Sequence, residues 1–106
     1  MMTQDEELLH LYQETSSTRL QKLQMGLLQL EQEPHSQAVL TDLCHELDDL
    51  KDDANSIGLE TIVTVAQELG LVLNALKKHQ IKFTLDINDC LCQGIYVIDQ
   101  LVYETV

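Results

Sequence analysis

Carboxylates crowd the segment between residues 42 and 53. The run holds one cation, Lys51, beside six acids: Asp42, Glu46, Asp48, Asp49, Asp52 and Asp53. Side chains four residues apart share one helix face, so two aspartate pairs in this run have the spacing to bridge a divalent cation. The segment lacks the looped oxygen ligands and the turn glycine of a calcium site. We therefore interpret the run as the solvent-facing side of an amphipathic helix, and expect no metal site there.

The cysteines are the other candidate metal ligands, and they number three: Cys44, Cys90 and Cys92. Cys90 and Cys92 are separated by one residue, so on a helix they point in different directions. A zinc site needs ligands that converge on one point. We interpret all three as small buried or flanking side chains, and expect neither a metal nor another cofactor.

Hydrophobic periodicity assigns these residues to helices. Apolar side chains recur at steps of three and four along four segments. They predict helices over about residues 3–32, 36–57, 60–78 and 84–105. Thr3, Ser36 and Thr84 are suitable N-caps, and Pro34 and Gly58 stand where helices commonly end. Short connections between amphipathic helices predict one all-α domain over 1–106, an antiparallel up-down-up-down four-helix bundle.

The same periodicity predicts which side chains face the core. In the first helix the expected inward stripe begins at Leu8 and has a polar gap at Ser16. In the last helix we expect the inward stripe to hold Ile87, Leu91, Gly94, Ile98, Leu101 and Thr105. Tyr96 and Tyr103 lie outside that stripe. We expect them to cap the edge of the core, with a partner-binding strip as the alternative.

The charge of the chain limits its partners. Eighteen acidic residues against six basic ones give a formal charge of −12. Such a surface repels phosphate backbones and anionic lipid, so we expect neither nucleic acid nor a membrane as a partner. No apolar stretch approaches the length of about 20 residues that a membrane span needs. The acidic N-terminus also lacks the features of a secretion signal. We expect a cytoplasmic domain that docks to a protein and is not an enzyme.

One segment of the second predicted helix has a recognisable pattern. Leucine, lysine and a small residue occur at Leu50, Lys51 and Ala54, and Gly58-Leu59 follows. This arrangement resembles the central helix of histidine-phosphotransfer (HPt) domains, of the type found at the N-terminus of chemotaxis-type histidine kinases. Weaker similarities, such as Val-Ala-x-x-Leu in the third predicted helix, extend over nearly the whole chain. The resemblance implies an HPt bundle, which in that family carries phosphate between a kinase domain and a receiver domain.

The departures from the family pattern fall on its chemically active positions. Asp48 stands where the resemblance expects the phosphorylatable histidine, and Asp52 where it expects a glycine that lets a receiver domain approach. Gln67 and Gly70 match the histidine and glutamate that tune the phosphohistidine from the third helix. Lys51 is retained, and in the family it steadies the phosphoryl group by charge-assisted hydrogen bonds. We predict a degenerate domain without a catalytic residue, which docks a receiver or a kinase catalytic domain but carries no phosphate at position 48.

Two alternatives stay open. His45 lies one helical turn before Asp48, about 4.5 Å along the axis, and is expected to be exposed. An active phosphocarrier that uses His45 is therefore the main alternative, although the surrounding carboxylates would repel a phosphoryl group. The second alternative is a scaffold or dimerisation bundle unrelated to phosphorelay.

Overall fold

The computed structural model describes residues 3–105, and residues 1, 2 and 106 of the predicted domain lie outside that range. Its helices are α1 (Gln4–Gln32), α2 (Gln37–Ser56), α3 (Glu60–Lys77) and α4 (Leu85–Tyr103). The hydroxyls of Thr3, Ser36 and Thr84 each accept a backbone N–H from three residues further on. They are therefore the N-caps of α1, α2 and α4, so these helices begin one residue later than the predicted ranges.

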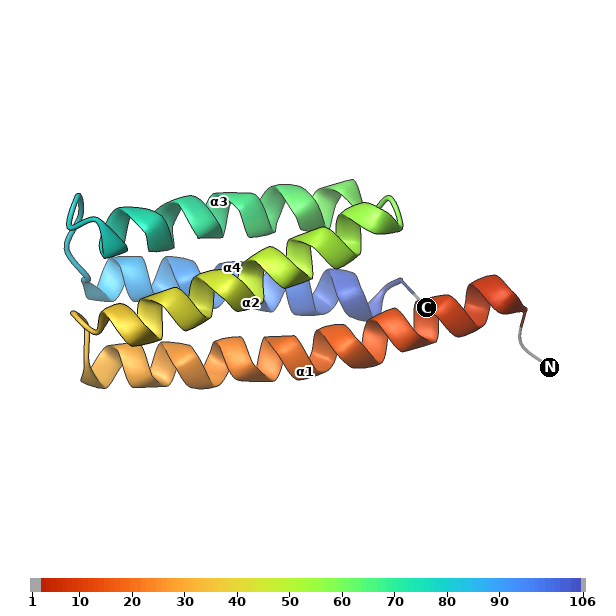
Figure 1. Ribbon diagram of the computed structural model, residues 1–106, viewed down its shortest axis with the longest axis horizontal. Helices are drawn as coiled ribbons and strands as arrows, with labels where there is room; N and C mark the ends of the chain where they lie inside the picture. The colour runs from red at the N-terminus through yellow and green to blue at the C-terminus, as the bar shows by residue number, and fades with distance from the viewer. Residues whose placement is uncertain (1–2, 106) are drawn as a thin grey trace.

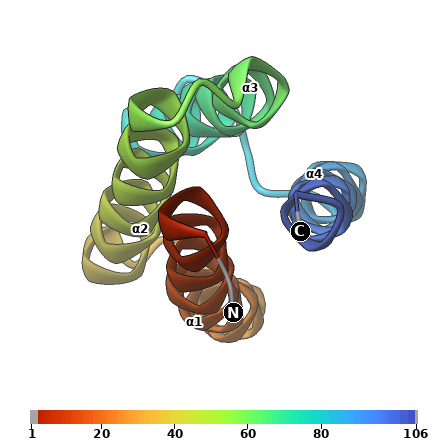
Figure 2. The same ribbon diagram turned by 90° about the vertical axis from the view of Figure 1, so that its right-hand side faces the viewer.

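The helices run alternately up and down along the long axis of a bundle that measures 49 × 21 × 21 Å (Figure 1). α1 packs against α2 and α4, and α3 packs against the same two helices, which completes a ring (Figure 2). This arrangement confirms the predicted antiparallel four-helix bundle. α1 is the longest helix, and its N-terminal end extends beyond the other three. Within residues 3–105, no helix combines the length and the apolar character that crossing a membrane requires.

The core is one continuous apolar cluster to which every helix contributes. α2 contributes the leucines and alanine that its periodicity predicts: Leu40, Leu43, Leu47, Leu50 and Ala54. In α1, Ser16 is fully buried, so the inward-facing stripe of this helix includes the polar residue that interrupts its apolar pattern. The prediction for Leu8 is wrong, since 51% of this residue is exposed. Leu8 lies in the first turns of α1, beside a surface hollow that it lines together with Ser56 and Ile57 at the end of α2.

The inward face of α4 differs from the prediction by a rotation of the helix. Its buried residues are Asn88, Leu91, Ile95, Ile98 and Val102. Leu91 and Ile98 belong to both stripes, whereas Asn88, Ile95 and Val102 are buried in place of Ile87, Gly94 and Leu101. The centre of the buried stripe is therefore turned by about 60° from the predicted one. Tyr96 and Tyr103 lie about 100–120° around the helix from the centre of the buried stripe. They are 63% and 76% exposed. The expectation that the two tyrosines cap the core edge is therefore wrong.

Two helix ends close with a residue at positive φ. Gly58 follows α2 with φ 77°, in the region where glycine avoids the steric penalty of a Cβ. His79 follows α3 with φ 58°, although it carries a side chain. Its neighbour Gln80 donates its backbone N–H to the carbonyl of Ala75 at 2.8 Å, the long hydrogen bond of a Schellman-type helix end. His79 therefore occupies a position that suits glycine better.

Candidate functional site

The central part of α2 carries most of the residues that the sequence analysis predicts to form the functional site. The buried leucines on either side, Leu47 and Leu50, set the rotation of this helix about its axis. Asp48 and Asp52 are consequently exposed, as are His45 on α2 and Gln67 on α3, whereas Lys51 is half-buried. The exposed fractions thus agree with the rotation that the leucine periodicity predicts.

One contact sets the register of α2 against α3. The thiol of Cys44 lies 4.0 Å from Oδ1 of Asn74. The two helices are antiparallel and rise by the same distance per residue. Counting four residues forward from Cys44 and four back from Asn74 therefore brings Asp48 level with Gly70. Three residues more bring Lys51 level with Gln67. The structure thus places Asp48, Lys51 and Gln67 along one seam, at the side where α2 meets α3.

Gly70 leaves the space beside this seam open. A Cβ built at Gly70 would meet no atom within 4 Å. The flank of α3 at the level of Asp48 therefore offers room for an approaching group and no titratable side chain at that position. Gln67 is an exposed residue of α3 that this register places level with Lys51, and its amide can donate or accept a hydrogen bond but carries no charge.

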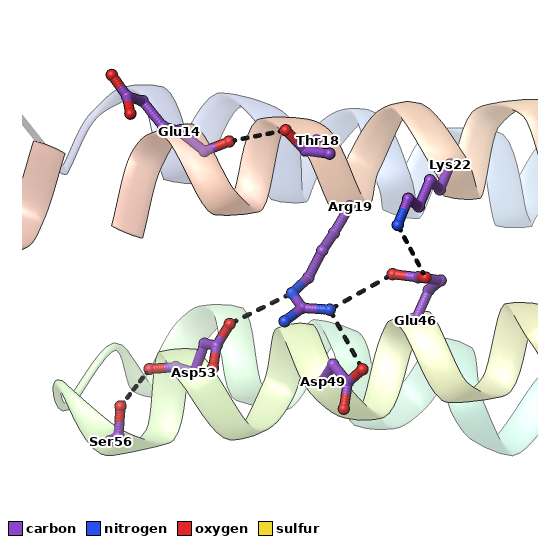
Figure 3. Close-up of polar contacts among 8 residues, drawn as sticks. All are labelled: Glu14, Thr18, Arg19, Lys22, Glu46, Asp49, Asp53 and Ser56. Carbon is purple, nitrogen blue, oxygen red and sulfur yellow. Dashed lines mark hydrogen bonds and ion pairs between the residues drawn. The ribbon is translucent and has the colours of Figure 1, made fainter. Parts of the chain in front are cut away.

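The opposite flank of α2 is neutralised by α1 (Figure 3). Nη1 of Arg19 lies 3.5 Å from Glu46 and 3.2 Å from Asp49, and its Nε lies 3.3 Å from Asp53. Lys22 adds a contact of 3.8 Å to Glu46. The interpretation of the whole acidic run as a solvated face is therefore wrong for this half. Asp48 lies about 100° or more around the helix from each of these three acids, whereas Asp52 lies about 60° from Asp49 and about 100° or more from the other two.

Sequence reasoning missed Arg19, although a signal for it was present. Arg19 and Lys22 lie three residues apart beside the inward-facing Leu20 and Leu23, which places both cations on one flank of α1. The acids at 46, 49 and 53 have the matching spacing on α2. What the sequence lacked was the knowledge that these two flanks face each other.

His45 lies apart from the seam between α2 and α3. It lines a surface hollow between α1 and α2 together with Asp42, Glu46 and Asp49, and with Lys22 from α1. Glu46 and Asp49 are paired with Arg19 and Lys22, so Asp42 is the carboxylate of this hollow that has no ion pair among the described residues. Within residues 3–105, no cluster of three or more histidine, cysteine or acidic side chains is arranged to hold a metal ion.

Burial affects the Cys44 thiol beside the seam. Desolvation raises the pKa of Cys44, and the nearby carboxylate of Asp48 acts in the same direction, while Lys77 opposes it. A thiol held in its neutral form is a poor nucleophile and a poor metal ligand. Cys44 therefore acts as a packing residue of the α2–α3 seam, as the sequence predicts.

Comparison with known proteins finds similarity both in sequence and in structure. A gliding motility regulatory protein from Myxococcus xanthus is 41% identical over 68 residues, which are 64% of this chain and 9% of that protein. The CheA phosphotransferase domain from Thermotoga maritima has a TM-score of 0.89 and 26% sequence identity, over 92% of this chain and 93% of that one. No protein-family model matches the sequence.

These similarities support an HPt-like four-helix bundle of the chemotaxis-kinase type. The structural match extends over nearly the whole bundle, so it includes the α2–α3 seam and is not limited to one helix pair. The chain spans less than a tenth of the curated relative that it matches. The similarity therefore concerns a short part of a much longer regulatory protein.

Proposed function

We propose that this HPt-like bundle is a cytoplasmic phosphorelay docking module that binds a receiver domain or a kinase catalytic domain but carries no phosphate at position 48. The observation that carries the proposal is the exposed carboxylate of Asp48, level with Gly70 on the α2–α3 seam. This is the position at which the resemblance to HPt domains expects a histidine. The fold supports docking, while the side chain at this position does not support transfer.

The chemistry of Asp48 argues against a phosphoryl carrier. An imidazole nitrogen is a neutral nucleophile, whereas a carboxylate repels the phosphoryl group that it must attack. At about 5 Å in water, one carboxylate and a phosphoryl dianion repel each other by about 1.5 kcal/mol. Asp52 is exposed one turn away and adds to this repulsion. Phosphoaspartate chemistry relies on a bound cation to neutralise such charges, and the described residues hold no cluster that would bind one.

Lys51 supports the docking half of the proposal. It is half-buried on the seam side of α2, and Arg19 and Lys22 belong to the other flank. A lysine in this position offers a hydrogen-bonding cation to an acidic partner surface beside the seam. The receiver or kinase domain would meet Lys51, Gln67 and the open space at Gly70, with Asp48 at the centre.

His45 gives the second candidate function, an active phosphocarrier with a displaced histidine. Its imidazole is exposed, so a partner can reach it. Asp42 lines the same hollow without an ion pair among the described residues and would repel an incoming phosphoryl group. The α2–α3 register also leaves His45 outside the seam. We therefore prefer the docking module.

A phosphotransfer assay tests both functions. The unmodified chain, His45→Gln, Asp48→His and the double variant Asp48→His/Asp52→Gly are incubated with a chemotaxis-type kinase core and labelled ATP. We expect label only on the two variants with the Asp48→His change, and more on the double variant because it removes a carboxylate from the seam. Binding of the unmodified chain to a receiver domain is measured separately by titration calorimetry.

Three outcomes would contradict the proposal. Label at residue 48 of the unmodified chain would show that the carboxylate carries phosphate after all. Label that disappears in His45→Gln would establish the displaced histidine as the acceptor. If no form takes label or binds a receiver while a control HPt domain does both, the bundle is a scaffold unrelated to phosphorelay.

A further inference from the structure

The seam between α1 and α4 lies diagonally across the bundle from the proposed docking site (Figure 2). It contains a hollow of about 310 Å³. Its lining is mostly apolar and comprises Leu27, Leu28, Cys92, Ile95 and Tyr96, with Gln24 and Glu31. The Leu28 and Tyr96 residues are each 63% exposed, so two large apolar side chains stand on its rim without a covering group. Exposed apolar groups around a hollow are typical of a binding groove.

The charged groups around this hollow are all acidic. Burial and the carboxylates of Glu31 and Asp89 raise the pKa of the Cys92 thiol, which indicates that both acids lie close to one end of the hollow. Glu14 and Asp99 line the adjoining hollow of the same seam. Glu31 is held in place, because the buried amide of Asn88 donates a hydrogen bond to its Oε1 at 2.8 Å.

The basic residues of the chain lie elsewhere. α4 contains no lysine or arginine. Arg19 and Lys22 are turned toward the acids of α2, and Lys51 belongs to α2 itself. The remaining three, Lys77, Lys78 and Lys82, follow one another at the end of α3 and in the connection to α4. The α1–α4 seam is therefore an apolar groove flanked by negative charge on both helices.

We propose that the α1–α4 seam is a second docking surface, and that its occupant is an amphipathic helix of a partner protein with lysine or arginine beside its apolar face. The groove between two antiparallel helices accepts the side-chain ridge of a third helix. An apolar side chain of the partner would enter between Leu28 and Tyr96, while its cations would meet Glu31, Asp89 and Asp99. A second copy of this chain is a poorer occupant, since two such seams would bring acid against acid.

This inference is independent of the proposed function, because it uses no residue of α2 or α3. The probe is a synthetic amphipathic helix of about 18 residues with leucines at positions i, i+3, i+4 and i+7 and lysines beside them. A second peptide keeps the leucines and replaces each lysine by glutamate. Each is titrated into the isotope-labelled chain, and amide chemical shifts map the contact. We expect the basic peptide to shift amides of residues 24–31 and 89–99, and the acidic peptide to leave them unchanged.

Variants then test the rim of the groove. Leu28→Asn and Tyr96→Ser should each weaken binding of the basic peptide about tenfold or more, as anchor residues of an interface do. The matched control is Leu71→Asn on α3, where the replaced leucine is 64% exposed but lies outside the seam. It should bind as the unmodified chain does. Circular dichroism confirms that each variant is folded, as expected for changes at exposed positions.

The proposal is overturned by any of three results. Shifts confined to the acidic run of α2 would mean that the peptide follows charge alone. Equal weakening by Leu71→Asn and Tyr96→Ser would mean that exposed apolar area, rather than the groove, decides binding. Concentration-dependent dimerisation in sedimentation experiments that Leu28→Asn abolishes would assign the seam to a second copy of the chain.

Discussion

Replacing Arg19 by methionine tests how α1 holds α2 in position. The guanidinium of Arg19 contacts Glu46, Asp49 and Asp53 at 3.5, 3.2 and 3.3 Å, and its side chain is 25% exposed. Methionine keeps most of the apolar stem of arginine, so the Arg19→Met change removes the charge with little loss of packing. The three carboxylates would then lie side by side along one flank of α2 without their shared cation.

The expected cost follows from the exposure of each partner. The Asp49 and Asp53 side chains are 58% and 41% exposed, so these two pairs contribute together about 1 kcal/mol after screening by solvent. Glu46 is 23% exposed and its Oε2 has no solvent contact, so the loss of its partner costs about 1 kcal/mol more. The total of about 2 kcal/mol corresponds to a fall in Tm of roughly 10 °C for a domain of about 100 residues.

Urea denaturation followed by far-ultraviolet circular dichroism measures this loss. The control is Lys82→Met, because Lys82 is exposed and forms no ion pair with the described residues. A double-mutant cycle with Glu46→Gln should give a coupling of about 1 kcal/mol, and about 1 M salt should reduce the Arg19→Met effect. If Arg19→Met is no more destabilising than Lys82→Met, or if the cycle is additive, the contacts seen here do not hold α1 to α2.

Three further predictions concern helix ends, helix packing and pH. His79→Gly should raise the free energy of unfolding by about 1 kcal/mol in urea denaturation, because glycine removes the strain of φ 58°; a loss of stability would show that the imidazole makes a favourable contact. Gly70→Ala should stabilise by about 0.5–1 kcal/mol through helix propensity, whereas Gly94→Ala should destabilise because its methyl group meets the side chain of Leu69. Equal effects of these two alanines on Tm would contradict that packing. Burial raises the pKa of Tyr12 above 10.0, so the folded chain keeps this proton longer than the unfolded chain, and stability should fall as pH rises above about 10. Tyr12→Phe should make that fall shallower, and an unchanged pH profile would refute the assignment.

The local features of the candidate site were predictable from the sequence. The leucines of α2 recur every three or four residues and face the core. Successive side chains are turned by about 100° around the helix axis, so the buried leucines determine where the residues between them point. The exposure of Asp48, Asp52 and His45 follows from this period alone, as do the N-caps at Thr3, Ser36 and Thr84. Such features depend on backbone hydrogen bonds within one helix, so a short stretch of sequence contains them. The assignment of a role to position 48 came from the resemblance to HPt domains and stays a prediction.

The tertiary structure decided which flank of each helix faces which neighbour. Arg19 and Asp53 are 34 residues apart in sequence, and only the packing of α1 on α2 brings them together. The rotation of α4 buries Ile95 in place of Gly94, because contacts with α1 and α3 favour that face over the neighbouring one. The negative charge on both sides of the α1–α4 seam arises in the same way, from the packing of two helices that are far apart in the sequence. A helix period states how side chains are directed around one axis, whereas the pairing of flanks depends on side chains from distant parts of the chain fitting against each other.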